Sequence, residues 1–228
     1  MEVGNEIPAS LVRWYGPRRV ERFLERLYRA AKREDPDALV TYVSYPSTEY
    51  LNPACLDIAC FNVYLEDRDS LASYLARLQN LCGDRPLLMA EVGLDSQRNG
   101  EDRQAEVLDW QVRTAIEAGS AGVFVFAWSD SWHRGGHEIL DWSFGLVDRD
   151  GLAKPALAAV EKAFAAPLRP GDRGWPSISV VVCTYNGART IRECLEGLAR
   201  LTYPRTAERS SFDVVVINDG SVDATSII

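Results

Sequence analysis

Long apolar runs and a surplus of basic residues are both missing from this sequence of 228 residues. No stretch reaches about 18 consecutive apolar residues, so we expect no segment that crosses a membrane. The first ten residues, MEVGNEIPAS, lack the basic start and the apolar stretch of a signal peptide. Lysine and arginine total 25 against 33 aspartates and glutamates, for a net charge of -8. This balance disfavours nucleic acid as a partner and suits neutral sugars.

Cysteine is also scarce, and its spacing is typical of neither a disulfide framework nor a zinc site. The number is odd, and most members lie in apolar runs such as residues 57–61, DIACF. We therefore predict buried, reduced thiols and a cytoplasmic location, which leaves membrane association through other parts of a longer parent open. The five are Cys55, Cys60, Cys82, Cys183 and Cys194.

Strand-like and helix-like stretches alternate through residues 1–165, which is the pattern of a parallel α/β fold. Its strand-like stretches are continuously apolar, which predicts a sheet covered on both faces. The expected strands are residues 38–44, 56–64, 86–92 and 122–128, and the expected helices are 18–33, 70–81, 102–118 and 155–165.

The composition changes at residue 166. Residues 166–177, APLRPGDRGWPS, are rich in proline and glycine and have no periodicity, so we interpret them as an interdomain linker. The next stretches read as a strand at 178–183, a helix at 190–201 and a strand at 212–217. We therefore predict a first domain over 1–165, a linker, and the beginning of a second domain over 178–228.

Polar and aromatic residues stand at the expected carboxyl ends of successive strands in the first domain. These features are Asn5-Glu6, Asn62-Val-Tyr64, Glu91 and Trp128. A β/α barrel gathers its chemistry at these strand ends. A glutamate that directly follows an apolar strand is costly to bury unless it is paired or used. Two such glutamates facing one cavity would make a site.

This arrangement resembles the barrel of clan A glycoside hydrolases, most closely the C-terminal part of glycoside hydrolase family 2. There an Asn-Glu pair ends the fourth strand, a tyrosine the sixth, a glutamate the seventh and a tryptophan the eighth. Residues 144–156, FGLVDRDGLAKPA, also resemble that family's passage into its last helix. The resemblance covers about residues 1–165 and implies a partial TIM (β/α)8 barrel from about strand 4 to strand 8. Met1 then reads as a truncation or an alternative start.

The resemblance also implies a role for each residue. Glu6 would be the general acid/base and Glu91 the nucleophile. Asn5 would bind the sugar 2-hydroxyl, and Tyr64 would position the nucleophile. Trp128 would form the floor of the sugar subsite. Retaining hydrolysis needs one protonated and one ionised carboxyl about 5–5.5 Å apart, and such closeness separates their pKa values. The implied substrate is an oligo- or polysaccharide, and no cofactor is implied. Taken singly, these residues also fit surface or core positions.

The loop after the last expected strand leaves two alternatives open. His133 and His137 have no evident third partner for a metal, so they either touch substrate or are exposed structural residues. Trp132 and Trp142 either stack on sugar faces or simply pack.

Two motifs in the second domain resemble the start of glycosyltransferase family 2. The first strand ends in Thr184-Tyr185-Asn186, and the second is followed by Asp219-Gly-Ser-Val-Asp-Ala-Thr225. The resemblance implies a Rossmann-like nucleotide-sugar (GT-A) fold. Loops beyond the carboxyl ends of such strands hold the ligand. These four residues, 184–186 and 219, would contact the nucleotide of a UDP-sugar, with Mn²⁺ or Mg²⁺ bound by a motif that lies further along in the family.

Together these features predict a carbohydrate-active enzyme in which a retaining β-glycosidase-type barrel is fused to a nucleotide-sugar-dependent glycosyltransferase. The alternative is a transferase whose barrel is a non-catalytic carbohydrate-binding or structural module. We expect negligible hydrolysis by this chain alone, because a barrel lacking three strands leaves ladder edges unpaired and one wall of the site absent.

Overall fold

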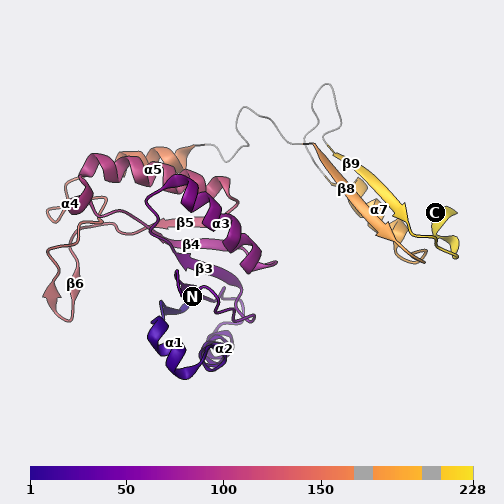
Figure 1. The fold of residues 1–228 in the computed structure, drawn as a ribbon, viewed down its shortest axis with the longest axis horizontal. Coiled ribbons are helices and arrows are strands. Elements are labelled where there is room, and N and C mark those ends of the chain that lie inside the picture. The colour runs from indigo at the N-terminus through magenta and orange to yellow at the C-terminus, as the bar shows by residue number, and fades with distance from the viewer. Residues whose placement is uncertain (167–176, 202–211, 228) are drawn as a thin grey trace. The chain divides into compact units, whose positions relative to one another are not determined.

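The computed structural model describes residues 1–166, 177–201 and 212–227 (Figure 1). The chain divides into two compact units, Met1–Leu168 and Arg169–Ile228, and each is described by itself. Residues 167–176, most of the expected linker, lie outside the described residues. The boundaries of that linker stay a prediction.

The first unit is built on a parallel sheet of five strands that neighbour one another in chain order, β1-β2-β3-β4-β5. All four pairings are parallel. The strands are β1 (Glu2–Asn5), β2 (Thr41–Ser44), β3 (Ile58–Asn62), β4 (Leu87–Val92) and β5 (Gly122–Val125). This sequential parallel order is that of a β/α barrel, and it brings the carboxyl ends of all five strands to one end of the sheet.

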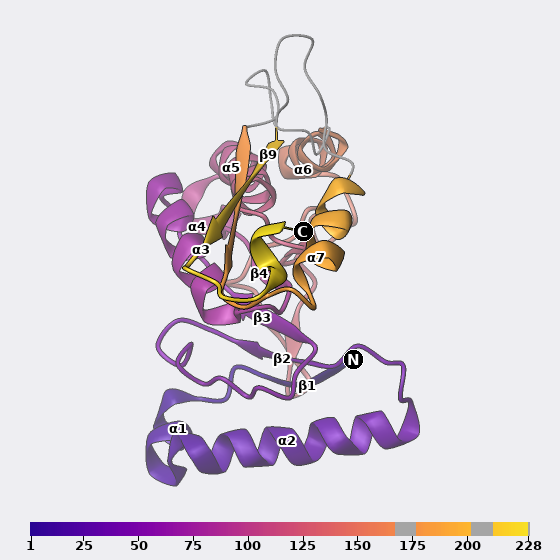
Figure 2. The ribbon, with the colours of Figure 1, turned by 90° about the vertical axis from the view of Figure 1, so that its right-hand side faces the viewer.

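Helices connect most of these strands. They are α1 (Ala9–Tyr15), α2 (Pro17–Glu34), α3 (Arg68–Cys82), α4 (Ser96–Asn99), α5 (Glu101–Glu117) and α6 (Pro155–Ala165). Figure 2 shows α3, α5 and α6 grouped together, with α2 lying beside β1 and β2. A short antiparallel hairpin, β6 (His133–Arg134) and β7 (His137–Glu138), follows β5.

The core of this unit is formed where α3 and α5 meet the sheet. Leu71, Leu75 and Leu78 recur on one face of α3 and are fully buried. Burying each such side chain contributes about 1.5–3 kcal/mol relative to leaving it exposed. The Asp67 side chain accepts a hydrogen bond from the Ser70 backbone N–H and caps the first turn of α3. A rigid helix therefore supports β3 and β4, whose ends carry candidate site residues.

The last strand is shorter than expected. β5 ends at Val125. Phe126 N–H still donates to the Val92 carbonyl of β4 at 2.8 Å, but from Ala127 onward the backbone bonds to residues 144–147 instead of continuing the ladder. Ala127 N–H donates to the Phe144 carbonyl at 3.0 Å, and Val147 N–H donates to the Trp128 carbonyl at 2.9 Å. The prediction of a strand to residue 128 is therefore wrong by three residues.

The second unit begins with a βαβ arrangement. β8 (Ile178–Thr184) and β9 (Phe212–Asn218) pair in parallel, and α7 (Ile191–Ala199) lies between them in sequence. A 3-10 turn, η1 (Ala224–Ile227), follows. Cys183 and Cys194 are exposed here, so the prediction of buried thiols is wrong for these two. Cys183 lies on β8, which pairs with β9 alone among the described strands, and Cys194 lies on α7, whose buried residue is Ile191. No described helix is long and apolar enough to cross a membrane.

Candidate functional site

The candidate site of the first unit lies at the carboxyl ends of β1, β3 and β4. Asn5 ends β1, and Glu6 follows it in a left-handed conformation with φ of 46°. The Glu6 N–H donates to the Val43 carbonyl at 2.9 Å, which holds this turn against β2. On the other side, Asn62 at the end of β3 is the register partner of Glu91 on β4. The sheet thus presents a carboxylate on either side of Asn62.

Asn62 links the two ends of this arrangement. Its side-chain Nδ2 donates to Glu6 Oε1 at 2.8 Å and to Asn5 Oδ1 at 3.2 Å. The side chain is 1% exposed, so these bonds form away from bulk water. Its position at the end of a buried strand was the sequence signal for Asn62, although no role could be assigned to it from the sequence.

Tyr64 is the second partner in the site. Its hydroxyl donates a hydrogen bond to Glu91 Oε2. Burial, together with the neighbouring Glu91 charge, raises the pKa of the Tyr64 hydroxyl well above its usual range. Tyr64 therefore stays protonated and acts as a donor toward the carboxylate.

The environment of Glu91 shifts its ionisation. Burial raises the pKa of the Glu91 carboxyl, and the negative charge of Glu6 raises it further. Hydrogen bonds from Tyr64 and Asn62 act in the opposite direction, although the pKa stays above the ordinary value of 4.5. The Glu91 carboxyl therefore senses the charge of Glu6.

Glu6 and Glu91 line the same pocket, which has a volume of about 410 Å³. Its aromatic walls are Tyr64, Phe126, Trp142 and Phe144. The chain passes closely at Gly93, where an added Cβ would lie 2.5 Å from the Phe126 carbonyl oxygen and 3.2 Å from the Phe144 ring. Glycine at this position allows the aromatic wall to approach the end of β4. Concave, partly apolar pockets with a few convergent polar groups are typical of ligand sites.

Trp128 is not brought to this pocket. It is 66% exposed, whereas Phe126, two residues earlier, lines the pocket. The early end of β5 explains the difference, because Phe126 N–H still bonds to Val92 of β4, whereas Ala127 and Trp128 bond to residues 144–147. Phe126 and Phe144 are therefore wall residues that the sequence reasoning missed. Phe126 lies within the expected last strand, and Phe144 opens the stretch 144–156 that resembles the passage into the last helix.

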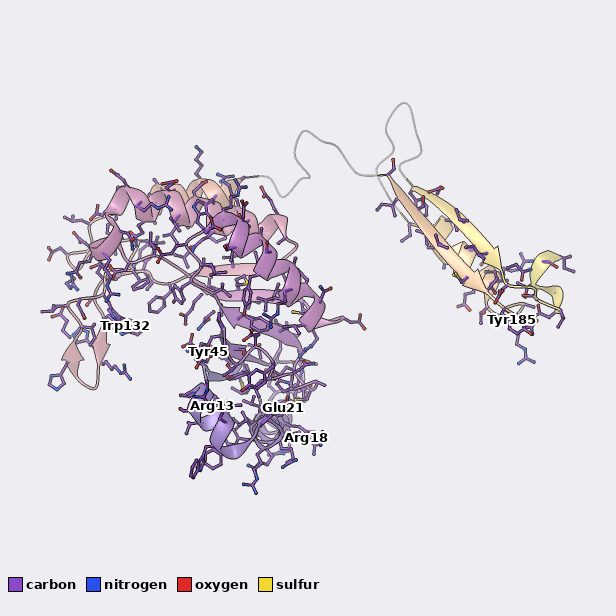
Figure 3. The ribbon with its side chains drawn as sticks, in the orientation of Figure 1. Arg13, Arg18, Glu21, Tyr45, Trp132 and Tyr185 are labelled. Atoms are coloured by element: carbon purple, nitrogen blue, oxygen red, sulfur yellow. The ribbon has the colours of Figure 1, made fainter. Side chains whose placement is uncertain are left out.

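In the second unit, the loops after β8 and β9 come together. Asp219 N–H donates to the Thr184 carbonyl at 2.9 Å, and Asn186 Oδ1 accepts from Val222 N–H at 2.9 Å. Asn186 N–H also donates to Ser221 Oγ at 2.8 Å. The predicted residues 184–186 and 219 thus occupy one loop cluster, in which the Tyr185 side chain is exposed (Figure 3).

Asp223 tightens the same loop cluster. Its carboxylate accepts from Ala188 N–H at 3.1 Å and from Thr225 N–H at 3.0 Å. The Thr225 hydroxyl bond lowers the pKa of Asp223, so this carboxylate is ionised at neutral pH. Within residues 1–166, 177–201 and 212–227, no group of three His, Cys, Asp or Glu side chains could hold a metal ion.

Sequence comparison matches the second unit to a known family. Residues 179–228 match the family described as Glycosyl transferase family 2. The chain is also similar to Glycosyltransferase AglE of Haloferax volcanii, with 38% identity over 53 residues. That match covers 23% of this chain and 16% of the relative, so the chain spans about a sixth of that protein's length.

Solved structures resemble the chain in fold. GH5_18 from Streptomyces cattleya in complex with GlcNAc gives a TM-score of 0.59 at 17% identity, covering 88% of this chain and 56% of that one. The GH2 beta-galacturonidase from Eisenbergiella tayi bound to galacturonate gives 0.54 at 18%, covering 64% and 30%. At such identities these likenesses show the fold alone. The first unit has the architecture of part of a TIM barrel, the fold that these glycoside hydrolases share, and residues 179–228 of the second unit match the Glycosyl transferase family 2 model.

Proposed function

We propose that residues 1–166 carry the carboxylate pair of a retaining β-glycosidase, within a carbohydrate-active enzyme that also contains a nucleotide-sugar-dependent transferase. The observation that carries the hydrolase proposal is that Glu6 and Glu91 line one pocket and each has its own hydrogen-bond partner, Asn62 and Tyr64 respectively. Retaining glycosidases require two such carboxyl groups facing one sugar.

The reaction assigns one step to each carboxyl group. Ionised Glu91 attacks the anomeric carbon while protonated Glu6 gives its proton to the leaving glycosidic oxygen, so the C–O bond breaks as an ester bond to Glu91 forms. Glu6 then takes a proton from water, and the water oxygen attacks the anomeric carbon and releases Glu91. Two inversions give net retention of configuration.

The hydrogen bonds support this division of roles. Tyr64 donates to one oxygen of Glu91 and leaves the other free to attack the sugar. Asn62 donates to Oε1 of Glu6 and leaves Oε2 to carry the proton. The raised pKa of Glu91 opposes its ionisation, and Tyr64 and Asn62 counter this. The nucleophile therefore becomes fully ionised only above the usual pH range of a glutamate.

Charge around the pocket favours a neutral substrate. Its carboxylates are Glu6, Glu66, Glu91 and Asp95, and its one lining cation, Arg98, is paired with Asp95 at 3.3 Å. An anionic sugar bound in this pocket would be repelled by these carboxylates. Of the sugars bound by the two structural relatives, we therefore favour a neutral type such as GlcNAc over galacturonate for this chain.

The hydrolase proposal can be tested by trapping the covalent intermediate. β1 and β5 are the edge strands of an open sheet, so we propose that turnover is slow and that a single-turnover measurement suits this chain. Incubation with 2,4-dinitrophenyl 2-deoxy-2-fluoro-β-glycosides of glucose, galactose and mannose, followed by peptide mapping by mass spectrometry, should place a glycosyl adduct on Glu91. Glu91→Gln should abolish the adduct.

Two further variants sharpen this test. Glu6→Gln should still accumulate the adduct, because dinitrophenolate leaves without acid assistance, and azide should then release a β-glycosyl azide. Glu117→Gln, on the exposed side of α5, should label like the parent chain. An adduct on Glu66 would contradict the assignment of Glu91 as the nucleophile, and sugar binding without any adduct would support the alternative of a non-catalytic carbohydrate-binding barrel.

We also propose that residues 177–227 form the nucleotide side of the transferase site. The linked loops carrying Thr184, Tyr185, Asn186 and Asp219 support this assignment. UDP should bind with a Kd that Asp219→Ala weakens by about tenfold or more, as expected for loss of a hydrogen bond to a charged group. Asp213→Ala, at the start of β9, is the matched control. Binding of UDP unchanged by Asp219→Ala would contradict the assignment.

Two features of the transferase remain proposals. The donor would be a UDP-sugar held with Mn²⁺ or Mg²⁺, and repeating the titration with and without Mn²⁺ tests the metal. Because this family draws on cytoplasmic nucleotide sugars, we propose that the enzyme works on the cytoplasmic side of the cell.

A further inference from the structure

Two stacked tryptophans form an aromatic surface beside the pocket. The rings of Trp132 and Trp142 stack with centroids 6.2 Å apart and an interplanar angle of 30°. Trp142 lines the pocket, while Trp132 lies outside its lining and is 37% exposed. Figure 3 shows Trp132 at the base of the β6 hairpin. Neither ring is used in the proposed hydrolysis step.

This surface is continuous with the wall that holds the proposed nucleophile. Trp132 meets the Phe126 ring edge-on at 5.2 Å, and Trp142 meets Phe144 at 6.3 Å. Phe126 and Phe144 in turn contact the ring of Tyr64, at 6.3 Å and 5.8 Å. The aromatic contacts therefore run without interruption from the residue bonded to Glu91 out to the exposed face of Trp132.

Arg149 fixes the loop that carries Trp142. Its Nη2 donates to the carbonyl oxygens of Ile139 at 3.2 Å, Leu140 at 3.0 Å and Trp142 at 3.4 Å. The Ile139 N–H donates to the Trp132 carbonyl at 2.8 Å, so both tryptophans are anchored at the base of the hairpin. A surface ordered in this way pays less of the cost of immobilising side chains when a ligand binds.

We propose that Trp132 and Trp142 are a stacking platform for the sugar ring next to the one that is cleaved, so that the substrate is a β-linked disaccharide or longer glycan. This inference rests on the proposed hydrolase function. Flat aromatic rings offer large apolar faces at low entropic cost, and the C–H face of a pyranose is their match. The cleaved sugar occupies the pocket between Glu6 and Glu91, and its neighbour lies over the exposed Trp132 ring and the partly exposed Trp142 ring.

The test compares paired ligands on a chain that cannot cleave them. In a Glu91→Gln background, calorimetric titrations use cellobiose against methyl β-glucoside, mannobiose against methyl β-mannoside, and chitobiose against GlcNAc. For the pair that binds, we expect the disaccharide to bind about tenfold more tightly than the monosaccharide, a difference of about 1.4 kcal/mol. Trp132→Ala should remove this advantage and leave the monosaccharide Kd within about twofold.

Further variants separate stacking from packing. Trp132→Phe keeps a flat ring and should retain most of the disaccharide advantage, whereas Trp142→Ala should weaken both ligands because Trp142 also lines the pocket. Trp14→Ala on α1, where the side chain is 83% exposed, is the matched control and should change neither Kd. Thermal unfolding of each variant checks that the unit is folded.

The outcomes distinguish the two proposals. Equal binding of the paired ligands, or a disaccharide advantage that survives Trp132→Ala, overturns the platform, and trapping of the glycosyl adduct on Glu91 would then leave the hydrolase intact. Loss of that adduct with a disaccharide advantage still present would overturn the hydrolase and leave a binding platform. Absence of binding by all six ligands counts against the platform.

Discussion

Asn62 donates a hydrogen bond to Glu6 Oε1 at 2.8 Å across 56 residues of sequence. The same Nδ2 reaches Asn5, and the register of β3 with β4 sets Asn62 beside Glu91. One buried amide therefore spans the distance between the proposed acid/base and the proposed nucleophile. Because an amide carries no charge, it can bond to Glu6 in either protonation state without adding to the negative charge of the pocket.

Replacing Asn62 should disable the proposed acid/base more than the fold. Asn62→Ala removes the donor to Glu6, and we expect hydrolysis of the glycosyl adduct on Glu91, the step that needs Glu6 as base, to slow by about tenfold or more, as for hydrogen bonds to charged groups. Asn62→Asp should slow it further, because a third carboxylate would raise the pKa values of its neighbours. Rates equal to those of the parent chain would show that the amide is not part of the site.

Tyr64→Phe should move the pH dependence of labelling. The nucleophile must be ionised, so the rate rises with pH through the Glu91 pKa, which lies above 4.5 in the parent chain. Losing the Tyr64 hydroxyl removes an interaction that lowers this pKa, so the acidic limb should shift to higher pH. Rates measured between pH 4 and 9 give the shift, and Tyr50→Phe, at an exposed tyrosine, is the control. A limb that stays in place would contradict the role of Tyr64.

The sequence predicted the convergence of Glu6, Tyr64 and Glu91 because strand ends in a β/α fold meet at one edge. The apolar spacing of α3 and α5 likewise placed both helices within a few residues of their observed limits. The end of β5 was not predictable in the same way. It depends on hydrogen bonds from residues 127 and 128 to residues 144–147, and no local pattern reports such distant partners. We therefore predicted that Trp128 would line the pocket, whereas Phe126 does so.

The contributions of Phe126 and Trp128 to sugar binding can be compared directly. Phe126→Ala removes a pocket wall and should weaken sugar binding in the Glu91→Gln background by about tenfold, because it opens a void behind the ligand. Trp128→Ala should change the Kd by less than about twofold, since truncating an exposed side chain rarely matters for binding elsewhere. Titration with the disaccharide that binds gives both values, and the reverse order of effects would restore Trp128 as the subsite floor.

Gly93→Ala should disturb the aromatic wall from its base. The added Cβ would lie 2.5 Å from the Phe126 carbonyl oxygen, which is closer than such atoms approach, so the backbone must shift. We expect a loss of about 1–3 kcal/mol of stability, together with slower labelling of Glu91. Gly4→Ala is the matched control, because its nearest neighbour would be the Tyr42 ring at an ordinary 3.5 Å. Chemical denaturation of both variants measures the difference.

We expect the buried ion pair of Lys154 and Asp130 to stabilise the first unit next to the aromatic wall. Their side chains are only 3% and 6% exposed and lie 3.1 Å apart, and Lys154 also donates to Ser96 Oγ at 2.9 Å. Lys154→Met leaves the Asp130 charge buried without its partner, so we expect a loss of about 3–5 kcal/mol in the free energy of unfolding. Asp130→Asn in addition should recover part of it, because a neutral amide oxygen can still accept from Gly145 N–H, which now donates to Asp130 Oδ1 at 2.7 Å. If the double variant is less stable than Lys154→Met, the cost of the unpaired charge is not what dominates at this position.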